Sequence, residues 1–491
     1  MTLNRTAREG DRSRWLALIV LCAGMLMIVL DATIVNVALP SIQRDLGFSQ
    51  SSLAWVVNAY LIPFGGLLLL AGRLGDLIGR KRVFMIGLAV FTAASALCGA
   101  AGSQWTLMGA RFIQGVGGAM TSTVILGVIV TMFPVPREQA RAIGVFSFTA
   151  AAGGSVGLLA GGVLTQAVNW HWIFFVNLPI GLAALVLALW LVEPDRGIGL
   201  RQGADVVGAV LVTSALMLGV YTIVEARDYG WTSVHTLGLG ALASVLLAAF
   251  LIRQARTASP LLPLGLFRSR NVSGANLVQA LMVAGMFGLF FLGALYMQRV
   301  LGYDPLRIGL AFLPVAVTIG ALSFRLAAEL TTRFGARSTL LTGLSLILAG
   351  LLLFTRAPVD ASYVRDVLPS MLLMGVGAGL SFPGLLTLGM SGATAQDSGL
   401  ASGLINTTAQ VGGSLGLAVL ATLATSRTDH LLAEGQSTAS ALTAGYQLAF
   451  GTGAGLVAAA ILVAATVLRS GADARGETER ESESRAGEEA A

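Results

Sequence analysis

Long apolar runs alternate with short polar segments between residues 15 and 468. A run of about 20 apolar residues is long enough to cross a bilayer as an α-helix. Fourteen such runs are present, with centres near residues 27, 61, 92, 118, 154, 182, 214, 245, 286, 316, 347, 376, 413 and 456. The first run follows several arginines, as a signal peptide would, but it is too long for one and contains Asp31. We therefore expect it to remain as a helix.

The composition agrees with a membrane protein. Hydrophobic residues make up 55% of the 491 residues and charged residues only 11%, whereas a soluble domain has roughly 25% charged residues. So few charges could not cover the surface of a soluble protein of this length. The sequence thus excludes soluble enzymes and predicts an all-α integral membrane protein.

The basic residues predict the orientation. With the N-terminus inside, 23 of the 31 Lys and Arg residues fall in inside segments, seven in outside loops, and Arg111 within a span. Because positive charge is concentrated on the cytoplasmic side, both termini are expected in the cytoplasm. This topology explains the net charge of +6 better than nucleic-acid binding does.

Nucleotide and metal chemistry find no support in the motifs. Lys81, the single lysine, is flanked by Arg80 and Arg82, so the Gly-Lys-Ser/Thr of an ATP-binding P-loop is absent. The three histidines are far apart and show no metal-ligand spacing. We therefore expect no metal and no cofactor. Cys22 and Cys98 both lie in apolar runs, where packing thiols are favoured over a disulfide.

Two glycine patterns recur at nearly one offset. Residues 144–157 match residues 403–416, which lie 259 positions later, and residues 115–120 match residues 375–380 at an offset of 260. The matches predict two six-helix halves in the same orientation, with two inserted helices between them. The predicted domains are an N-terminal tail (1–14), a first bundle (15–193), the inserted helices (204–255), a second bundle (271–468) and a disordered cytoplasmic tail (469–491).

Two ionisable residues lie well inside spans, Asp31 and Arg111. Their positions in the first and fourth helices place them roughly 12 Å and 10 Å from the outer ends at 1.5 Å per residue. Placing a charged side chain at this depth in the bilayer costs free energy, so a residue there is expected to have a structural or functional role. A static structural ion pair is one interpretation. We favour a proton-coupled carboxylate at Asp31 whose pKa is set by burial and by Arg111.

Two further motifs combine glycine with charge or with close helix spacing. Two interpretations of the loop at residues 72–82 are open. It is either a turn that does no more than fix the topology, or a loop with a specific conformational role. Its candidate residues are Gly72, Asp76, Gly79, Arg80 and Lys81. The fifth span carries glycines at spacings that permit close approach of a neighbouring helix. Close packing alone explains them, or the helices also slide along each other. These are Gly144, Gly153, Gly157, Gly161 and Gly162.

Polar residues within the spans can bridge helices or line a substrate cavity. The candidates for a cavity are Asn36, Asn58, Tyr60, Gln114, Asn276, Gln279, Tyr296, Gln298, Asn406 and Gln410. The set is uncharged and is mixed with Phe and Met. Such a cavity suits amphipathic or apolar solutes better than sugars or small ions.

These motifs together resemble the major facilitator superfamily. Residues 72–82 look like its motif A, residues 107–119 like motif B, and the glycines of the fifth span like motif C, the antiporter motif. Residues 30–40 and 170–181 resemble signatures of the 14-helix drug:proton antiporters of the EmrB/QacA type. The resemblance covers residues 15–468.

The resemblance implies a major facilitator fold and alternating access, with drugs or metabolites exported in exchange for protons across a bacterial plasma membrane. Asp31 would carry the proton and Arg111 would be its electrostatic partner. Asp76, with Arg80 and Lys81, would latch the outward-facing state. The implied partners are a small-molecule substrate, protons and the bilayer, without nucleic acid, plus a periplasmic adaptor if the source is Gram-negative.

The chain departs from the family pattern at three points. Leu158 stands where motif C usually has proline, so any kink there must come from glycine alone. His171 replaces an expected arginine, and we favour interfacial packing over pH sensing for it. The tenth and thirteenth spans lack the acids found in relatives that handle multivalent cations, which disfavours dicationic substrates.

Two alternatives to a multidrug exporter stay open. One is an exporter dedicated to a single metabolite such as a siderophore, peptide or amino acid, which would export none of a panel of unrelated dyes. The other is a membrane sensor or scaffold that transports nothing. The buried charges disfavour a scaffold, and transport assays in vesicles would decide.

Overall fold

A computed structural model describes residues 3–49, 52–195, 197, 199, 205–257, 260–262, 264–324, 326–390 and 398–468. Every regular element in these ranges is a helix. Each of the fourteen predicted centres lies within a helix. The predicted tail at 469–491 lies outside the described residues.

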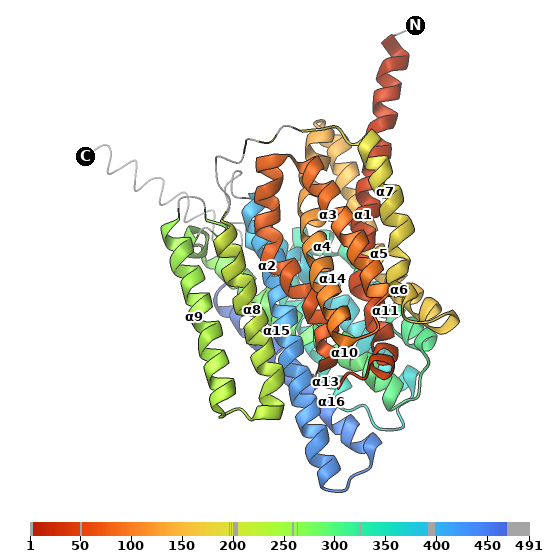
Figure 1. Cartoon of the computed structure of the whole chain (residues 1–491), viewed down its shortest axis with the longest axis vertical. Helices are drawn as coiled ribbons and strands as arrows, with labels where there is room; N and C mark the ends of the chain where they lie inside the picture. The colour runs from red at the N-terminus through yellow and green to blue at the C-terminus, as the bar shows by residue number, and fades with distance from the viewer. Residues whose placement is uncertain are drawn as a thin grey trace, which may run out of the picture.

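The first half packs as one group of helices. Its elements are α1 (Leu3–Leu46), the short η1 (Ser52–Ala54), α2 (Trp55–Ile78), α3 (Arg80–Gly99), α4 (Gln104–Met132), α5 (Pro136–Ala167), α6 (Trp172–Phe175) and α7 (Asn177–Leu191). Helix α4 packs against α2 and α3, and α1 packs against α5 and α7. The start of α1 and the end of α2 lie at the same end of the molecule, at the top of Figure 1.

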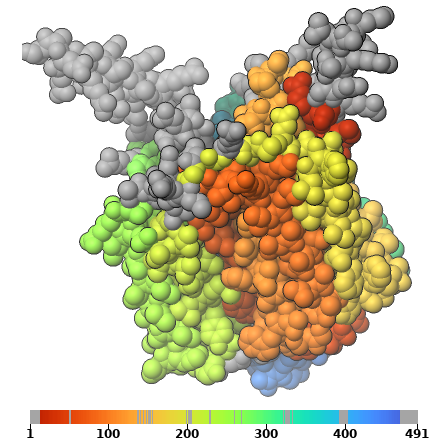
Figure 2. All heavy atoms as spheres, turned by 45° about the horizontal axis from the view of Figure 1, so that its top comes forward, coloured from red at the N-terminus to blue at the C-terminus, as the bar shows by residue number. Residues whose placement is uncertain are grey.

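The inserted pair forms a hairpin on the outside of the bundles. It consists of α8 (Val206–Tyr229) and α9 (Val234–Arg256). Helix α8 packs on α2 and on α15 (Ser398–Ala433), whereas α9 packs mainly on α8. Only 11% of the apolar window of α9 is buried, as expected for a lipid-facing helix. In Figures 1 and 2 the pair stands as a green column beside the orange helices of the first half.

The second half contains the remaining elements. They are η3 (Leu264–Arg268), α10 (Arg270–Arg299), α11 (Pro305–Phe324), α12 (Leu326–Phe334), α13 (Ala336–Phe354), η4 (Tyr363–Val367), α14 (Leu368–Met390), α15 and α16 (Thr438–Thr466). Helix α14 packs against α11 and α13, and α10 packs against α15 and α16.

The repeated glycines make equivalent contacts in the two halves. A Cβ atom at Gly117 of α4 would lie 2.8 Å from the carbonyl oxygen of Gly87 on α3. One at Gly377 of α14 would meet the carbonyl oxygen of Gly343 on α13 at 2.5 Å. Helices approach this closely only where a side chain is missing. The matched sequences therefore correspond to matched helix packing.

Twelve helices among the described residues are long and apolar enough to cross a membrane. Two shorter apolar stretches, Val156–Ala167 and Pro305–Ile319, lie within α5 and α11. These two helices occupy the positions of the fifth and tenth predicted spans. The total of fourteen spans stays a prediction.

Candidate functional site

The two charges predicted inside spans form a buried ion pair. Asp31 of α1 and Arg111 of α4 are both 0% exposed. Arg111 Nη1 donates hydrogen bonds to Asp31 Oδ2 at 2.5 Å and to Gln114 Oε1 at 2.7 Å. Its Nε donates to the carbonyl oxygen of Val56 on α2 at 3.0 Å. A buried charge is tolerated only when it is paired and hydrogen-bonded, and this pair meets that condition.

Two uncharged side chains complete the surroundings of Asp31. Its Oδ1 accepts hydrogen bonds from Gln114 Nε2 at 2.7 Å and from Asn177 Nδ2 of α7 at 3.2 Å. Gln114 also donates to Ser95 Oγ of α3 at 2.8 Å. Helices α4 and α7 thus supply the donors to a carboxylate on α1, and α3 holds one of those donors, Gln114. The sequence prediction missed Asn177 and Ser95, although an amide side chain at the start of the apolar helix α7 was a usable signal.

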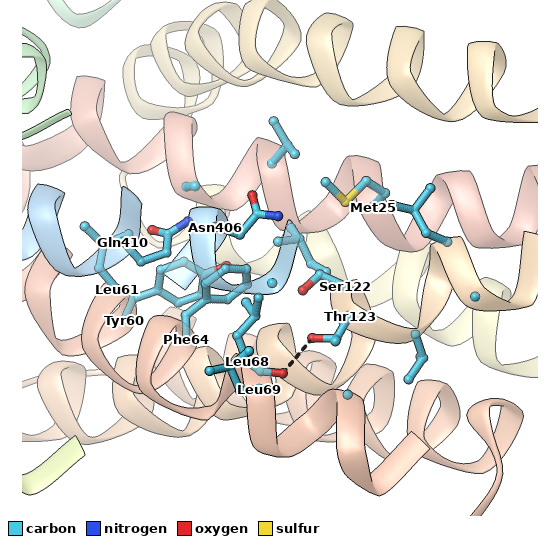
Figure 3. Close-up of a pocket in the computed structure, with 18 of the residues that line it drawn as sticks. Met25, Tyr60, Leu61, Phe64, Leu68, Leu69, Ser122, Thr123, Asn406 and Gln410 are labelled. Carbon is cyan, nitrogen blue, oxygen red and sulfur yellow. Dashed lines mark hydrogen bonds between the residues drawn. The ribbon is translucent and has the colours of Figure 1, made fainter. Parts of the chain in front are cut away.

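A cavity of about 1,040 Å³ lies beside the ion pair. It runs from Tyr60 and Arg111 to Asp76, at the end of the molecule where α1 begins. Figure 3 shows Asn406 and Gln410 of α15 facing Tyr60 and Phe64 of α2 across it. The rings of Tyr60 and Phe64 stack with centroids 5.6 Å apart. Both halves of the protein therefore contribute to the wall, which is mainly apolar and aromatic.

Three of the predicted cavity residues line this space, namely Tyr60, Asn406 and Gln410. Six others do not. Asn36 donates to carbonyl oxygens of its own helix, and Gln114 belongs to the Asp31 site. Asn58 and Gln279 are buried away from the cavity.

The remaining two stabilise the second half. Asn276 accepts a hydrogen bond from Thr408 Oγ1 at 2.8 Å, which joins α10 to α15. Tyr296 Oη donates to the carbonyl oxygen of Pro358 at 2.6 Å. The apolar pattern shows which residues lie in spans, but not which side of a helix faces the cavity. Ser122, Thr123 and Phe287 line the cavity and were not predicted.

The loop between α2 and α3 is held by side-chain contacts. Asp76 and Arg80 form an ion pair at 3.2 Å, and Arg80 Nη1 also donates to the carbonyl oxygen of Gly127 on α4 at 3.1 Å. Gly79 has a φ of +101°, which favours glycine. Gly72 and Asp76 line the mouth of the cavity.

Asp195 joins this loop to the end of the first half. Its carboxylate accepts hydrogen bonds from the backbone N–H groups of Arg80 at 2.7 Å and Lys81 at 3.0 Å. An anion at the first turn of α3 is stabilised by the helix dipole. Lys81 Nζ donates to the carbonyl oxygen of Leu189 on α7 at 3.0 Å. The sequence prediction missed Asp195, because it lies 115 residues from Arg80.

The glycines of α5 face two different helices. Cβ atoms at Gly153, Gly157 and Gly161 would press on α1, the last of them 2.7 Å from the carbonyl oxygen of Ile34. A Cβ atom at Gly162 would lie 2.8 Å from the carbonyl oxygen of Pro305 on α11. Helix α5 therefore packs between α1 of one half and α11 of the other. Gly144 lies in α5 but outside the residues whose surroundings are described.

The end of the molecule opposite the cavity mouth is closed by contacts between the halves. Arg299 at the end of α10 donates a hydrogen bond to Gln43 Oε1 of α1. Nearby, Gly309 of α11 packs on the backbone of Leu158 of α5. His171 contacts the carbonyl oxygen of Gly99 at 2.8 Å through its Nδ1. We call the Arg299–Gln43 and Leu158–Gly309 contacts the distal seal.

A polar cluster attaches the inserted hairpin to the rim of the cavity. Asp205 caps α8 and accepts hydrogen bonds from Arg253 Nε at 2.6 Å and Gln254 Nε2 at 2.7 Å. Burial opposes ionisation, but these donors outweigh it and hold the pKa of Asp205 below its usual value. Gln254 Oε1 accepts from the N–H of Leu262, next to the cavity-lining Leu261. The hairpin therefore positions part of the rim.

Comparison with known proteins identifies the family. Residues 21–417 match the family model of the Major Facilitator Superfamily. The chain belongs to the major facilitator superfamily. The superfamily assignment agrees with the resemblance found in the sequence motifs and with the all-helical architecture in two matched halves.

Several relatives in the superfamily are named for antibiotic resistance or export. The puromycin resistance protein pur8 of Streptomyces alboniger is 38% identical, covering 95% of this chain and 94% of the relative. The cephamycin export protein CmcT of Amycolatopsis lactamdurans is 37% identical over 85% of this chain and 86% of its own. A bacterial homologue of the human lysosomal transporter Spinster, crystallised in an inward-facing, unoccupied conformation, shares the fold with a TM-score of 0.64 at 16% identity. It covers 93% of this chain and 98% of that one.

Proposed function

We propose that this protein is a proton-coupled secondary exporter of hydrophobic or amphipathic small molecules such as antibiotics. The observation that carries the proposal is a buried carboxylate–arginine pair at the base of a largely apolar cavity that reaches only one end of the molecule. The resistance and export proteins among its relatives support the same activity. The proton gradient, rather than a cofactor or an enzymatic reaction, supplies the energy.

The proposed orientation places the cavity mouth and both termini in the bacterial cytoplasm. The excess of arginine on that side supports it. Substrate would enter the cavity from the cytoplasm or the inner leaflet. The distal seal would then separate while the opposite end closes around Asp76 and Arg80. An adaptor would be a further partner only in a cell with an outer membrane.

Proton exchange would take place at Asp31. A proton taken up from outside neutralises the carboxylate and weakens its pairing with Arg111, which favours release of the substrate. Return to the inward-open state brings the proton to the cytoplasmic side. An inside-negative potential contributes about 2.3 kcal/mol per net charge per 100 mV to this cycle.

The test is efflux by an Asp31→Asn variant in proteoliposomes under an imposed pH gradient. Asparagine keeps the size of the side chain but cannot ionise, so substrate efflux driven by the gradient should be lost. Asp304→Asn is the matched control, because Asp304 lies at the exposed start of α11, where it caps the helix and pairs with Arg307 at the surface. Asparagine caps equally well, and an exposed ion pair contributes little stability. Full gradient-driven efflux by correctly inserted Asp31→Asn protein would refute the coupling role.

A narrower specificity is the second candidate. The relatives named above each carry the name of one antibiotic, puromycin or cephamycin, which favours an exporter dedicated to a single compound. A panel of structurally unrelated compounds separates the two functions. Export of several of them supports multidrug activity, and export of one supports a dedicated transporter.

A further inference from the structure

One aromatic side chain lies between the cavity and the buried ion pair. Tyr60 lines the cavity, and its ring centroid lies 4.3 Å from Cζ of Arg111, in cation–π contact. Arg111 borders the base of the cavity, yet Arg111 and Asp31 are both 0% exposed. In this conformation, water in the cavity therefore does not reach the carboxylate.

Packing rather than hydrogen bonding holds the Tyr60 ring in place. The ring stacks on Phe64 and meets Phe91 edge-on, with centroids 6.5 Å apart. A Cβ atom at Gly118 of α4 would lie 3.1 Å from Tyr60 Oη, so the missing side chain makes room for the phenol.

Two polar atoms at this boundary are buried without a hydrogen-bond partner among the described residues. They are Tyr60 Oη and Arg111 Nη2. Because Tyr60 Oη has no partner there, no hydrogen bond of this hydroxyl has to break when the ring moves. A buried donor without an acceptor is also unfavourable, which lowers the cost of moving the ring. A ligand or water that enters when the ring moves would find both donors unused. The boundary is thus closed by a side chain that can be displaced.

We propose that Tyr60 is the partition that prevents proton exchange at Asp31 until a substrate occupies the cavity. This inference rests on the proposed function. A planar or aromatic substrate stacks on Phe64 in competition with the Tyr60 ring and displaces it from Arg111. Cavity water then reaches the protonated carboxyl group. The proton passes from the Asp31 carboxyl oxygen to a water molecule, which leaves the Asp31 carboxylate paired with Arg111 and a hydronium ion in the cavity.

The partition explains how an exporter avoids wasting the proton gradient. Without substrate, the Tyr60 ring stays over Arg111, so a proton that reaches Asp31 from outside cannot pass into the cavity. With substrate, the proton leaves toward the cytoplasm, and the restored ion pair prepares the next outward step. Tyr60 is thus a positioning residue that acts through Arg111. Loss of its ring is expected to cause proton flux in the absence of substrate, which a purely structural role would not produce.

The experiment measures proton influx into proteoliposomes without substrate, using a pH-sensitive dye inside and an imposed pH gradient. Tyr60→Ala removes the ring and should let protons through about tenfold faster than wild type, a factor that corresponds to a barrier lower by about 1.4 kcal/mol. Tyr60→Phe keeps the ring and should leak far more slowly than Tyr60→Ala. If the alanine variant does not insert, Tyr60→Val tests the same loss of the ring.

Phe354→Ala is the matched control. It removes a ring that is 0% exposed in the second half, packed against Tyr296, so it reproduces the loss of packing without opening the Asp31 site. A leak specific to Tyr60→Ala supports the partition. A substrate-free proton flux in Tyr60→Ala equal to that of wild type overturns it.

The same vesicles separate this inference from the proposed function. Wild-type protein is given puromycin and then the compound panel, and proton movement is recorded. If no compound moves protons in wild type, the exporter function fails. If wild type exchanges protons for a compound and the substrate-free proton flux of Tyr60→Ala equals that of wild type, only the proposed role of Tyr60 fails.

Discussion

Arg111 is the residue on which the buried site depends. Its guanidinium contacts Asp31, Gln114 and the backbone of Val56 at the same time. A buried ion pair is a weak source of stability, because the desolvation of both charges offsets their attraction. Its presence deep in a protein that is otherwise apolar therefore points to a role in activity. The planar fork of arginine, rather than its charge alone, satisfies three acceptors.

We predict that Arg111→Lys retains the charge but loses transport. A lysine amine cannot reach Asp31, Gln114 and Val56 together, and each buried acceptor left without a donor costs about 1–3 kcal/mol. Gradient-driven efflux should fall by about tenfold or more, since about 1.4 kcal/mol corresponds to a factor of ten. Initial rates at equal protein density measure this. Unchanged rates would show that charge alone is sufficient at this position.

At the scale of elements, α5 is one of the helices that join the two halves. Its glycines allow α1 to approach on one side and α11 on the other. At Gly157, Gly161 and Gly162 the neighbouring atoms include the backbones of Leu30, Ile34 and Pro305, so the helices meet at backbone distance there. Such surfaces permit one helix to slide along another. The glycine spacing is consistent with an element that moves during transport.

We predict opposite outcomes for two glycines of α5 that lie three residues apart, Gly154 and Gly157. A Cβ atom at Gly157 would lie 2.9 Å from the carbonyl oxygen of Leu30, whereas one at Gly154 would meet nothing within 4 Å. Gly157→Ala should therefore destabilise the protein by about 1–3 kcal/mol through overpacking and slow efflux.

Gly154→Ala is the matched control for this substitution. It should leave thermal unfolding in detergent and the efflux rate close to wild type. Equal unfolding temperatures and efflux rates for the two variants would refute the close contact between α5 and α1.

At the scale of the whole molecule, the structure represents one state of a two-state cycle. The cavity reaches the end that carries Asp76, and the distal seal closes the other end. The α8–α9 hairpin packs on both α2 and α15. When the halves rock, the hairpin must therefore shift against at least one of them.

We predict that joining Gln43 to Arg299 stops transport. The double variant Gln43→Cys/Arg299→Cys, treated with a cleavable bifunctional thiol reagent, should lose efflux and regain it when a reductant cleaves the link. The pair Ser437→Cys/Ser440→Cys is the control, because the link joins the cap residue of α16 to the first turn of the same helix. Undiminished efflux by completely cross-linked protein would show that the distal seal does not open.

The sequence predicts the helices better than it predicts the site. Every apolar run corresponds to a helix, because burial in lipid requires long apolar segments with internally satisfied backbones. Asp31 and Arg111 were recognisable because charges are rare in spans. Asn276 and Tyr296, which were predicted to line a cavity, instead bond within the second half in this structure, because hydropathy does not show which neighbour a polar side chain faces. Asp195 and Asn177 depend on contacts between distant segments, which no local pattern contains.

The single lysine has a practical consequence. Lys81 is the one lysine in the 491 residues, and its amine is bound to the end of α7 beside the cavity mouth. Reagents that modify amines can therefore attach a fluorophore to this side chain, with the N-terminal amine as the other site. The natural sequence thus already contains a chemical handle at the loop proposed to latch the transporter, without an engineered cysteine.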